Sequence, residues 1–395
     1  MKFDNAAISL PHLWSSPFVR WQGRLADVSS YDLAYAVTRD AMQERAIDPD
    51  TVDHLVLGNT VVQPRAFFAT PWLAARLGMN GVTGPSIAQA CATSVACLAH
   101  AAGMVEMDAQ AQPLVVVTDR TSNGPLLVYP QSQSQAGAPL TEHWVLDNFA
   151  SDPNTGQSMV ITAENTARDG GVTRQALDDL TLLRWQQYRQ SLADDRRFQR
   201  QYMQSVRWSQ GRRSWQVDAD EGVHEYSAEG LASLKPVQPE SVVTPGGQTH
   251  PADGCAGALV CNRQQAATLS AGRGVVRLLS AGYARAGKAQ MPKAATTAAL
   301  RALEIAGISI RDVRLIGTHN PFAVNDVWLA QQTGFDLEKM NVYGSSLIYG
   351  HPQGPTGMRG IAELGWALRE AGGGIGVFTG CAAGDTGAAV VLRVD

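Results

Sequence analysis

The chain has 395 residues, of which 45% are hydrophobic and 17% are charged, so it can form two packed domains and is too apolar to be disordered. Its formal net charge of -4 argues against a nucleic-acid partner. The N-terminal residues lack the pattern of a secretion signal, and no uncharged apolar stretch of about 18 residues, the length that spans a membrane, is evident. We therefore expect a soluble, cytoplasmic protein with no membrane partner.

Helical patterns alternate with short apolar runs along the chain, which predicts an α/β sheet with helices on its faces. An amphipathic helix over residues 31–45 leads into the first predicted strand, and a second helix over 297–306 leads into the fourth. Each predicted strand contains Val, Leu or Ile, and most of the strands are flanked by turn residues. The predicted strands cover residues 53–57, 114–118, 256–261, 313–317, 375–379 and 388–393.

The two helix–strand units are similar in sequence. Adding 261 to the residue numbers lays Ile47 and Val52 on Ile308 and Val313, so helix, turn and strand onset coincide. The same offset places Val117 on Phe378. A constant offset over about 80 residues predicts two halves with one topology.

The segment between the halves breaks this repeat and carries a charged helical run over residues 173–204. We interpret it as an inserted subdomain that covers one end of the core, where loops shape binding sites. The predicted organisation is an N-terminal half over 1–120, an inserted loop domain over 121–249 and a C-terminal half over 250–395.

Cysteine chemistry is the first functional signal. The five cysteines are odd in number and show no CxxC spacing, which argues against a disulfide framework and a zinc site, and we expect no metal. Cys91 lies between the turn residues Gly84-Pro85 and a small-residue helix, where a helix N-terminus would lower the pKa of the thiol. Cys91 is thus a candidate nucleophile; the alternative is an inert buried cysteine.

Three further residues lie in turn-rich segments. His351 lies in a Gly- and Pro-rich stretch that would hold its ring rigidly as a general base, or simply as a turn-capping residue. Cys381 follows a predicted strand on a glycine-rich loop, the usual place for a site in an α/β fold. His319 also follows a strand, where it would donate a hydrogen bond to an oxyanion or belong to an ordinary turn.

In their order and spacing, these motifs resemble the thiolase superfamily, the acetyl-CoA acetyltransferases and 3-ketoacyl-CoA thiolases. Further matches are Leu234-Lys235-Pro236 and Asp253-Gly254. The resemblance implies an α/β thiolase fold with two similar βαβαβαββ halves, a five-layered α-β-α-β-α core and an inserted loop domain. That loop domain would bind coenzyme A and make dimer contacts.

The resemblance also implies residue roles. Cys91 would form an acyl-enzyme, with His351 as its base, and Cys381 would be the acid/base at the α-carbon. His319 and His351, and the backbone N–H groups of Cys91 and Ala383, would bind oxyanions. Coenzyme A would be a substrate, with no permanently bound cofactor. The expected contacts to substrate or coenzyme A are Met159, Thr249, Phe322, Arg207, Arg212 and Arg213.

The chain departs from the common pattern at His319-Asn320-Pro321-Phe322, where ordinary thiolases carry Asn-Glu-Ala-Phe, and so resembles the sterol carrier protein type. The implied reaction is CoA-dependent cleavage of a 3-ketoacyl-CoA to acetyl-CoA or another short acyl-CoA, or the reverse Claisen condensation. The alternatives are a ketosynthase-like condensing enzyme and a thiolase-like retro-aldolase subunit.

Two hypotheses concern specificity and assembly. Tyr349 and the tryptophans Trp14, Trp21 and Trp72 are compatible with a branched or aromatic acyl group, and a dicarboxylic one also stays open. The resemblance implies a homodimer or homotetramer. A small zinc-ribbon and OB-fold partner subunit is a further expectation.

Overall fold

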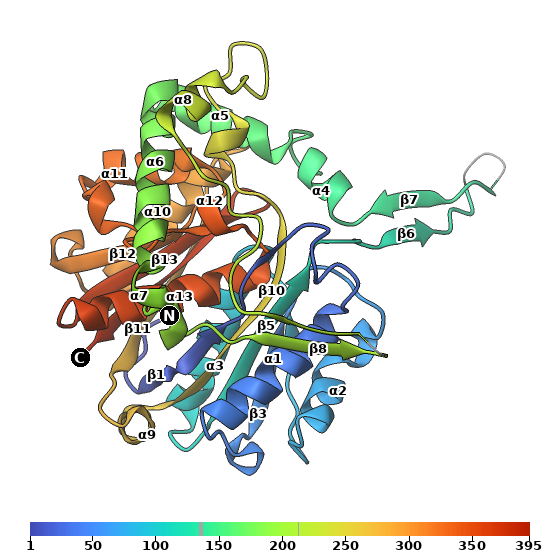
Figure 1. Cartoon of the computed structure of the whole chain (residues 1–395), viewed down its shortest axis with the longest axis vertical. Helices are drawn as coiled ribbons and strands as arrows, with labels where there is room; N and C mark the ends of the chain where they lie inside the picture. Colours follow the sequence, from blue (N-terminus) through green and yellow to red (C-terminus); the bar gives the residue numbers. More distant parts are fainter. Residues whose placement is uncertain (134–136, 212) are drawn as a thin grey trace.

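The computed structural model describes residues 1–133, 137–211 and 213–395, and within them ten strands form one mixed sheet (Figure 1). The strands are β1 (Ala6–Ser15), β2 (Val19–Arg20), β3 (His54–Gly58), β4 (Ser86–Ile87), β5 (Pro113–Arg120), β10 (Ala252–Asn262), β11 (Val275–Arg285), β12 (Val313–His319), β13 (Gly374–Ala382) and β14 (Thr386–Val394). Their order is β12-β13-β14-β11-β1-β10-β5-β3-β4, with β2 beside β10. All six predicted strands are present.

The strand order is symmetric about the antiparallel pair β1–β11, where Ala7 faces Arg277. On each side an antiparallel pair comes next, β1–β10 and β11–β14, followed by β10–β5 and β14–β13. A parallel pair, β5–β3 or β13–β12, completes each half. The predicted duplication is therefore confirmed. Sequence analysis missed four strands of this sheet, the long β1 and β11 and the two-residue β2 and β4.

The helices obey the same offset of 261 residues. The principal helices are α1 (Ser30–Glu44), α2 (Ala69–Arg76), α3 (Thr93–Met107), α9 (Arg263–Ser270), α10 (Met291–Ala306), α11 (Ala323–Thr333), α12 (Ser346–Tyr349) and α13 (Gly354–Glu370). The starts of α1 and α10, and those of α3 and α13, differ by that number. The predicted helix over 297–306 is the C-terminal part of α10, which begins earlier with a proline in its first turn.

The helices α3 and α13 form the central layer of the protein. Both pack against strands of the two halves and against each other, while α1 covers the outer face of the first half and α10 that of the second. A Cβ at Gly357 of α13 would lie 2.8 Å from Ser94 Cβ of α3, so glycine permits this close packing. The result is the five-layered core that the resemblance implied.

The segment Ala90–Met107, which contains α3, is the one helix in the described part of the chain that is long and apolar enough to cross a membrane. It includes Glu106, and a search for uncharged stretches therefore misses it. The segment is mostly buried inside the protein, as expected of a core helix.

Part of the segment over 121–249 covers one end of this core, while its strand β8 (Val206–Gln210) packs against α1 of the first half (Figure 1). Its helices α5 and α6 pack against α10 and α11 of the second half, and its hairpin β6–β7 projects from the body (Figure 1). β10, which follows this segment, pairs with β1, β2 and β5 and so completes the sheet of the first half. The elements of the segment are β6 (Leu126–Tyr129), β7 (Leu140–His143), α4 (Leu146–Ala150), α5 (Met159–Asp169), α6 (Arg174–Ser191), α7 (Ala193–Arg196), β8 (Val206–Gln210), β9 (Arg213–Val217) and α8 (Ala228–Ser233).

Candidate active site

One cleft, with an empty volume of about 740 Å³, collects most of the predicted site residues. Seven of them line it: Cys91, Met159, Thr249, Phe322, His351, Cys381 and Ala383. Sequence analysis did not assign a role to the six other lining residues, which are Phe149, Val160, Gln248, Pro251, Met291 and Pro321. The cleft therefore draws on both halves of the core and on the inserted segment.

Cys91 lies just before α3, after Ala90, whose φ of 44° turns the chain sharply into the helix. Its Sγ lies 3.1 Å from His351 Nε2. Burial raises the pKa of the Cys91 thiol to about 12, with the Asp119 carboxyl as the next cause. Hydrogen bonds from the backbone N–H groups of Cys91 and Ala383 lower this pKa, so both groups lie near the sulfur. The predicted lowering of this pKa by the helix N-terminus is wrong, because burial is the larger effect.

Hydrogen bonds at both ring nitrogens and at the backbone N–H fix the position of His351. Its Nδ1 lies 2.6 Å from Thr356 Oγ1, and its backbone N–H donates to His250 O at 2.9 Å. With the proton on Nδ1 and donated to Thr356, Nε2 is the acceptor for the Cys91 thiol proton. Burial and the nearby His319 lower the pKa of His351 well below its usual value, so the resting pair is a neutral thiol and a neutral imidazole.

His319 supplies a free hydrogen-bonding nitrogen. Its Nδ1 lies 3.0 Å from Ser346 Oγ, whereas that hydroxyl lies 3.3 Å from Asn320 Oδ1. The Ser346 hydroxyl can donate its proton to either acceptor, and when it donates to His319 Nδ1 the N–H of the ring lies at Nε2. Nε2 is buried and has no hydrogen-bond partner among the described residues. Burial lowers the pKa of His319 to about 3, so this ring stays neutral.

Cys91, His319 and His351 each offer one ligand atom, and these atoms lie within 4.8 Å of one another. Thiolate and imidazole are ligands that suit zinc. Sequence analysis predicted no metal site from the spacing of the cysteines. That spacing is local and cannot reveal three ligands from distant segments, such as Cys91 and His351. Two of these atoms, Cys91 Sγ and His351 Nε2, already contact each other.

Cys381 lies at the end of β13 and is buried. Asn325 Nδ2 of α11 donates to its Sγ at 3.3 Å. Burial, and then the neighbouring Cys91, raise the pKa of the Cys381 thiol, while the bond from Asn325 lowers it. Both cysteines are therefore protonated at rest.

Sequence analysis missed three polar residues that hold these groups. Thr356 follows His351 by five residues and lies in the first turn of α13, and its hydroxyl group was its only signal in the sequence. Asn325 follows Phe322 by three residues, the spacing of a helix cap. Asp119 follows a buried predicted strand directly, and a carboxyl at that place is a usable signal.

The three arginines predicted to contact coenzyme A are not among the described residues that line the cleft. Arg207 in β8 forms ion pairs of 3.6 Å with Asp40 and Glu44 of α1, and it is not among the described residues that line the cleft. Arg212 lies outside the described residues, and the side chain of Arg213 is likewise not described.

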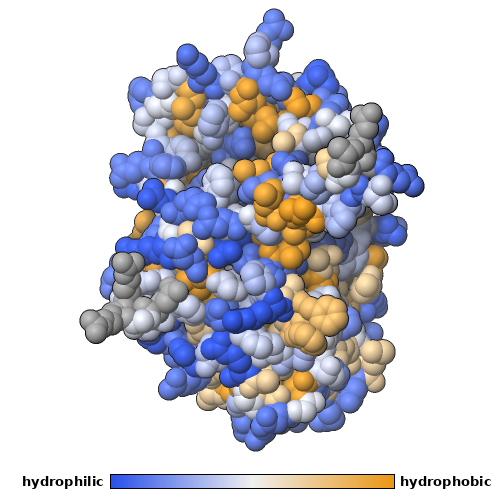
Figure 2. Space-filling view, turned by 90° about the vertical axis from the view of Figure 1, so that its right-hand side faces the viewer, coloured by the Kyte–Doolittle hydropathy of each residue, from blue (hydrophilic) through white to orange (hydrophobic). Residues whose placement is uncertain are grey.

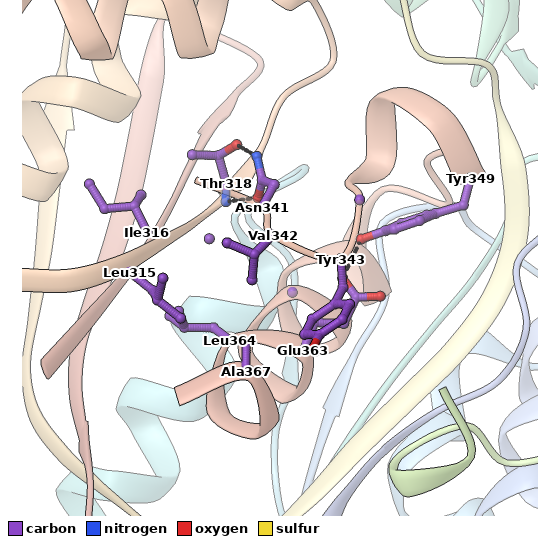
Figure 3. Close-up of a pocket in the computed structure, with 13 residues that line it drawn as sticks. Leu315, Ile316, Thr318, Asn341, Val342, Tyr343, Tyr349, Glu363, Leu364 and Ala367 are labelled. Carbon is purple, nitrogen blue, oxygen red and sulfur yellow. Dashed lines mark hydrogen bonds between the residues drawn. The ribbon is translucent and has the colours of Figure 1, made fainter. Parts of the chain in front are cut away.

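The aromatic residues suggested for the acyl pocket also point elsewhere. Tyr349 turns away from the cleft and donates to Glu363 at 2.9 Å, in the wall of a second, small cavity (Figure 3). Trp14 is buried in the outer core of the first half. Trp21 is partly exposed, and Trp72 lies under the guanidinium of Arg76. None of these four side chains lines the cleft as described, so they give no support to a branched or aromatic acyl group.

Comparison with known proteins agrees with this fold. The model of the thiolase N-terminal domain matches residues 14–264, and that of the thiolase C-terminal domain matches residues 273–394. The chain is 28% identical over 383 residues to an acetyl-CoA acetyltransferase of Escherichia coli (strain K12), covering 94% of this chain and 95% of the relative. It is 28% identical over 419 residues to a 3-ketoacyl-CoA thiolase of Photobacterium profundum, covering 96% and 95%.

Solved structures share the fold over the whole chain. The Bacillus anthracis acetyl-CoA acetyltransferase superposes with a TM-score of 0.89 at 23% identity and covers 100% of both chains. Human mitochondrial 3-ketoacyl-CoA thiolase in complex with CoA superposes with a TM-score of 0.87 at 21% identity, covering 99% of this chain and 98% of the other.

Proposed function

The chain belongs to the thiolase family, and from that premise we propose that it is an acyltransferase that cleaves a 3-ketoacyl-CoA with coenzyme A, or runs the reverse condensation. The observation that carries the proposal is the 3.1 Å contact between Cys91 Sγ and His351 Nε2, in one cleft with Cys381. A nucleophile, its base and a second acid/base are the groups that this reaction requires.

In the cleavage direction, Cys91 attacks the C3 carbonyl of the substrate while its proton passes to His351 Nε2. The carbonyl oxygen becomes an oxyanion, and the backbone N–H groups of Cys91 and Ala383 are the donors for it. Because the resting pair is neutral, the proton leaves as the new C–S bond forms.

The C2–C3 bond then breaks. The acyl group remains on Cys91 as a thioester, and the bond electrons leave as the enolate of acetyl-CoA. The unpartnered Nε2 of His319 is the donor for the enolate oxygen. Cys381 gives its proton to the α-carbon, which completes acetyl-CoA.

Coenzyme A enters and loses its thiol proton to the Cys381 thiolate. Its sulfur attacks the acyl-Cys91 thioester, releases the shortened acyl-CoA and frees the Cys91 thiolate. That thiolate recovers its proton from His351. The same steps in reverse form a carbon–carbon bond from two acyl-CoA molecules.

The cleft favours an uncharged acyl group. Met159, Met291, Phe149 and Phe322 are among its walls, and no Asp, Glu, Lys or Arg is among the described lining residues. A dicarboxylic acyl group would need a buried positive partner there. We therefore propose an apolar straight or branched acyl chain.

A ketosynthase-like condensing enzyme is the second candidate. The observation that favours it is the arrangement of one cysteine with two imidazoles, since His319 and His351 lie together beside Cys91. Such an enzyme does not need the second thiol, so the role of Cys381 discriminates between the two candidates.

The test is CoA-dependent cleavage of straight, branched, aromatic and dicarboxylic 3-ketoacyl-CoAs by the wild type and by Cys91→Ala and Cys381→Ala. Thiolysis of an apolar class that both substitutions abolish supports the proposal. Full condensation activity in Cys381→Ala supports the ketosynthase-like alternative. Absence of cleavage across the panel contradicts the thiolase reaction, and preferred cleavage of the dicarboxylic substrate contradicts the substrate class.

Assembly is also a proposal. The hairpin β6–β7 exposes Leu126, Val128 and Leu140, and the turn before α2 exposes Phe67 and Phe68. Figure 2, which views the molecule from the side of the projecting hairpin, shows hydrophobic patches between hydrophilic residues. Exposed apolar groups of this kind favour contact with another chain. We propose a homodimer or homotetramer, which sedimentation analysis would test; the zinc-ribbon partner stays a prediction.

A further inference from the structure

The buried carboxyl group of Asp119, at the end of β5, joins two segments that flank the cleft. Its Oδ1 accepts from the backbone N–H groups of Thr60 and Val61 at 2.7 and 2.9 Å, in the turn after β3. Its Oδ2 accepts from the Thr60 hydroxyl at 3.0 Å and from the Gly354 N–H at 2.9 Å. Four donors on one buried carboxyl group fix the distance between these segments.

The second of these segments carries the catalytic imidazole. Gly354 begins α13 and follows His351 by three residues, with Gln353 between them at φ 63° and ψ -102°. A Cβ at Gly354 would lie 2.7 Å from Asp119 Oδ2, so the carboxyl group can approach this backbone only because the residue is a glycine. The bond therefore anchors the C-terminal end of the loop that presents His351 to Cys91.

Asp119 also places a negative charge near the nucleophile. Its carboxyl group is one cause of the raised pKa of Cys91. It also raises the pKa values of Cys97 of α3, Tyr31 of α1 and Cys255 of β10. These four neighbours have pKa values raised far above neutrality. Among the described residues no lysine or arginine forms an ion pair with Asp119.

Burial raises the pKa of Asp119 to about 7, although its four hydrogen bonds act against that rise. The imidazoles of His319 and His351 both stay neutral near that pH, because their pKa values are lowered. Asp119 is thus the group beside the nucleophile whose charge changes near neutral pH.

We infer that Asp119 is a positioning residue: its carboxylate fastens the His351 loop to the turn after β3, and its charge adds to the cost that burial sets on ionising the Cys91 thiol. The inference rests on the proposed function, because it assigns Asp119 a part in the Cys91–His351 step. By the 261-residue offset Asp119 corresponds to Gly380, the residue before Cys381, so the strands β5 and β13 each end in a group that serves the cleft.

The experiment compares the wild type with Asp119→Asn, which keeps the shape of the side chain and removes its charge. We measure kcat and KM for thiolysis, and separately the rate at which iodoacetamide alkylates Cys91, followed by peptide mass spectrometry over a pH range. We expect kcat to fall by at least about tenfold with little change in KM, because the base is displaced. We expect alkylation near pH 8 to be about tenfold faster, because removal of a nearby like charge lowers a thiol pKa by about one unit.

Asp253→Asn is the matched control. Asp253 is also buried at the start of a core strand, accepts the Ser122 N–H at 2.9 Å and has a raised pKa, yet among the described residues its side chain forms no hydrogen bond with the His351 loop. This variant should lower thermal stability without changing the pH dependence of alkylation. If both variants shift alkylation equally, general destabilisation explains the effect and the inference is overturned.

Thr60→Val covers the case in which Asp119→Asn does not fold. The Thr60 hydroxyl lies 3.0 Å from Asp119 Oδ2 and 2.9 Å from Gln353 Oε1, so its loss loosens the same tie and retains the charge. A lower kcat with an unchanged alkylation profile supports the positioning role; unchanged kcat overturns it. If Asp119→Asn is alkylated faster but the wild type shows no thiolysis, only the proposed function is contradicted. If the wild type catalyses thiolysis and Asp119→Asn changes neither kcat nor the alkylation rate, only this inference is contradicted.

Discussion

The imidazole rings of His319 and His351 stack with their centroids 3.9 Å apart and an angle of 25° between their planes. His319 is the last residue of β12 and His351 precedes α13, so the fold brings together a strand end and a loop of the second half. A charge on one ring disfavours a charge on the other, and His319 is indeed a cause of the lowered pKa of His351. The stack thus favours the neutral form of both rings.

Removal of the His319 ring should reduce turnover. We expect His319→Ala to lower kcat by about 100-fold, the usual cost of one oxyanion donor, with little change in KM. His319→Asn retains an N–H donor and should lose less. Steady-state kinetics with the best substrate of the panel provide the measurement. Equal, wild-type kcat values in both variants would show that Nε2 of His319 does not serve the oxyanion.

Thr356 should set the tautomer of His351. Thr356→Val removes the oxygen that lies 2.6 Å from Nδ1, and Nε2 then no longer stays the unprotonated nitrogen. We expect kcat to fall by about 100-fold, within the range for loss of a general base. Thr356→Ser keeps the hydroxyl and is the control, with activity near that of the wild type. A fully active valine variant would contradict the assignment.

Asn325 should tune the second thiol. Its Nδ2 donates to Cys381 Sγ, which favours the thiolate, so Asn325→Ala should raise the pKa of Cys381 further. Exchange of the methyl protons of acetyl-CoA with deuterated water should then be slower, and its rise with pH should move to higher pH. This exchange is measured by mass spectrometry.

Asn325→Asp separates this effect from helix capping. Asn325 Oδ1 also accepts the Phe322 N–H at 3.2 Å, and an aspartate retains that acceptor while it repels a thiolate. The aspartate variant should therefore exchange as slowly as the alanine variant and stay closer to wild-type thermal stability. Normal exchange in the aspartate variant would assign Asn325 to capping alone.

The ion pair between Arg184 of α6 and Asp326 of α11 should dominate the attachment of the inserted segment. Both side chains are fully buried, and their atoms lie 2.9 Å apart. Arg184→Met leaves the Asp326 carboxylate buried without its partner, and we expect a loss of about 3–5 kcal/mol in unfolding free energy. Arg174→Met removes a partly exposed pair with Asp178 and should cost about 1 kcal/mol or less. Chemical denaturation compares the two; similar midpoints would refute the difference.

Much of the fold was accessible from the sequence, because helix and strand periodicity are local. The six predicted strands are present, and the duplication was visible in the 261-residue offset of Ile47 and Val52 from Ile308 and Val313. The strands β1 and β11 escaped prediction. β1 lies in the middle of the sheet and is buried along its whole length, so it shows no alternation of polar and apolar residues.

The sequence by itself determined the candidate residues Cys91, His351 and Cys381, through motifs whose order and spacing resemble the thiolase superfamily. Only the tertiary structure decided how they behave. Burial raises the pKa of Cys91 although a helix N-terminus would lower it, and Tyr349 points to Glu363 and not into the cleft. Desolvation and side-chain direction depend on atoms from segments hundreds of residues away, which no local pattern can report.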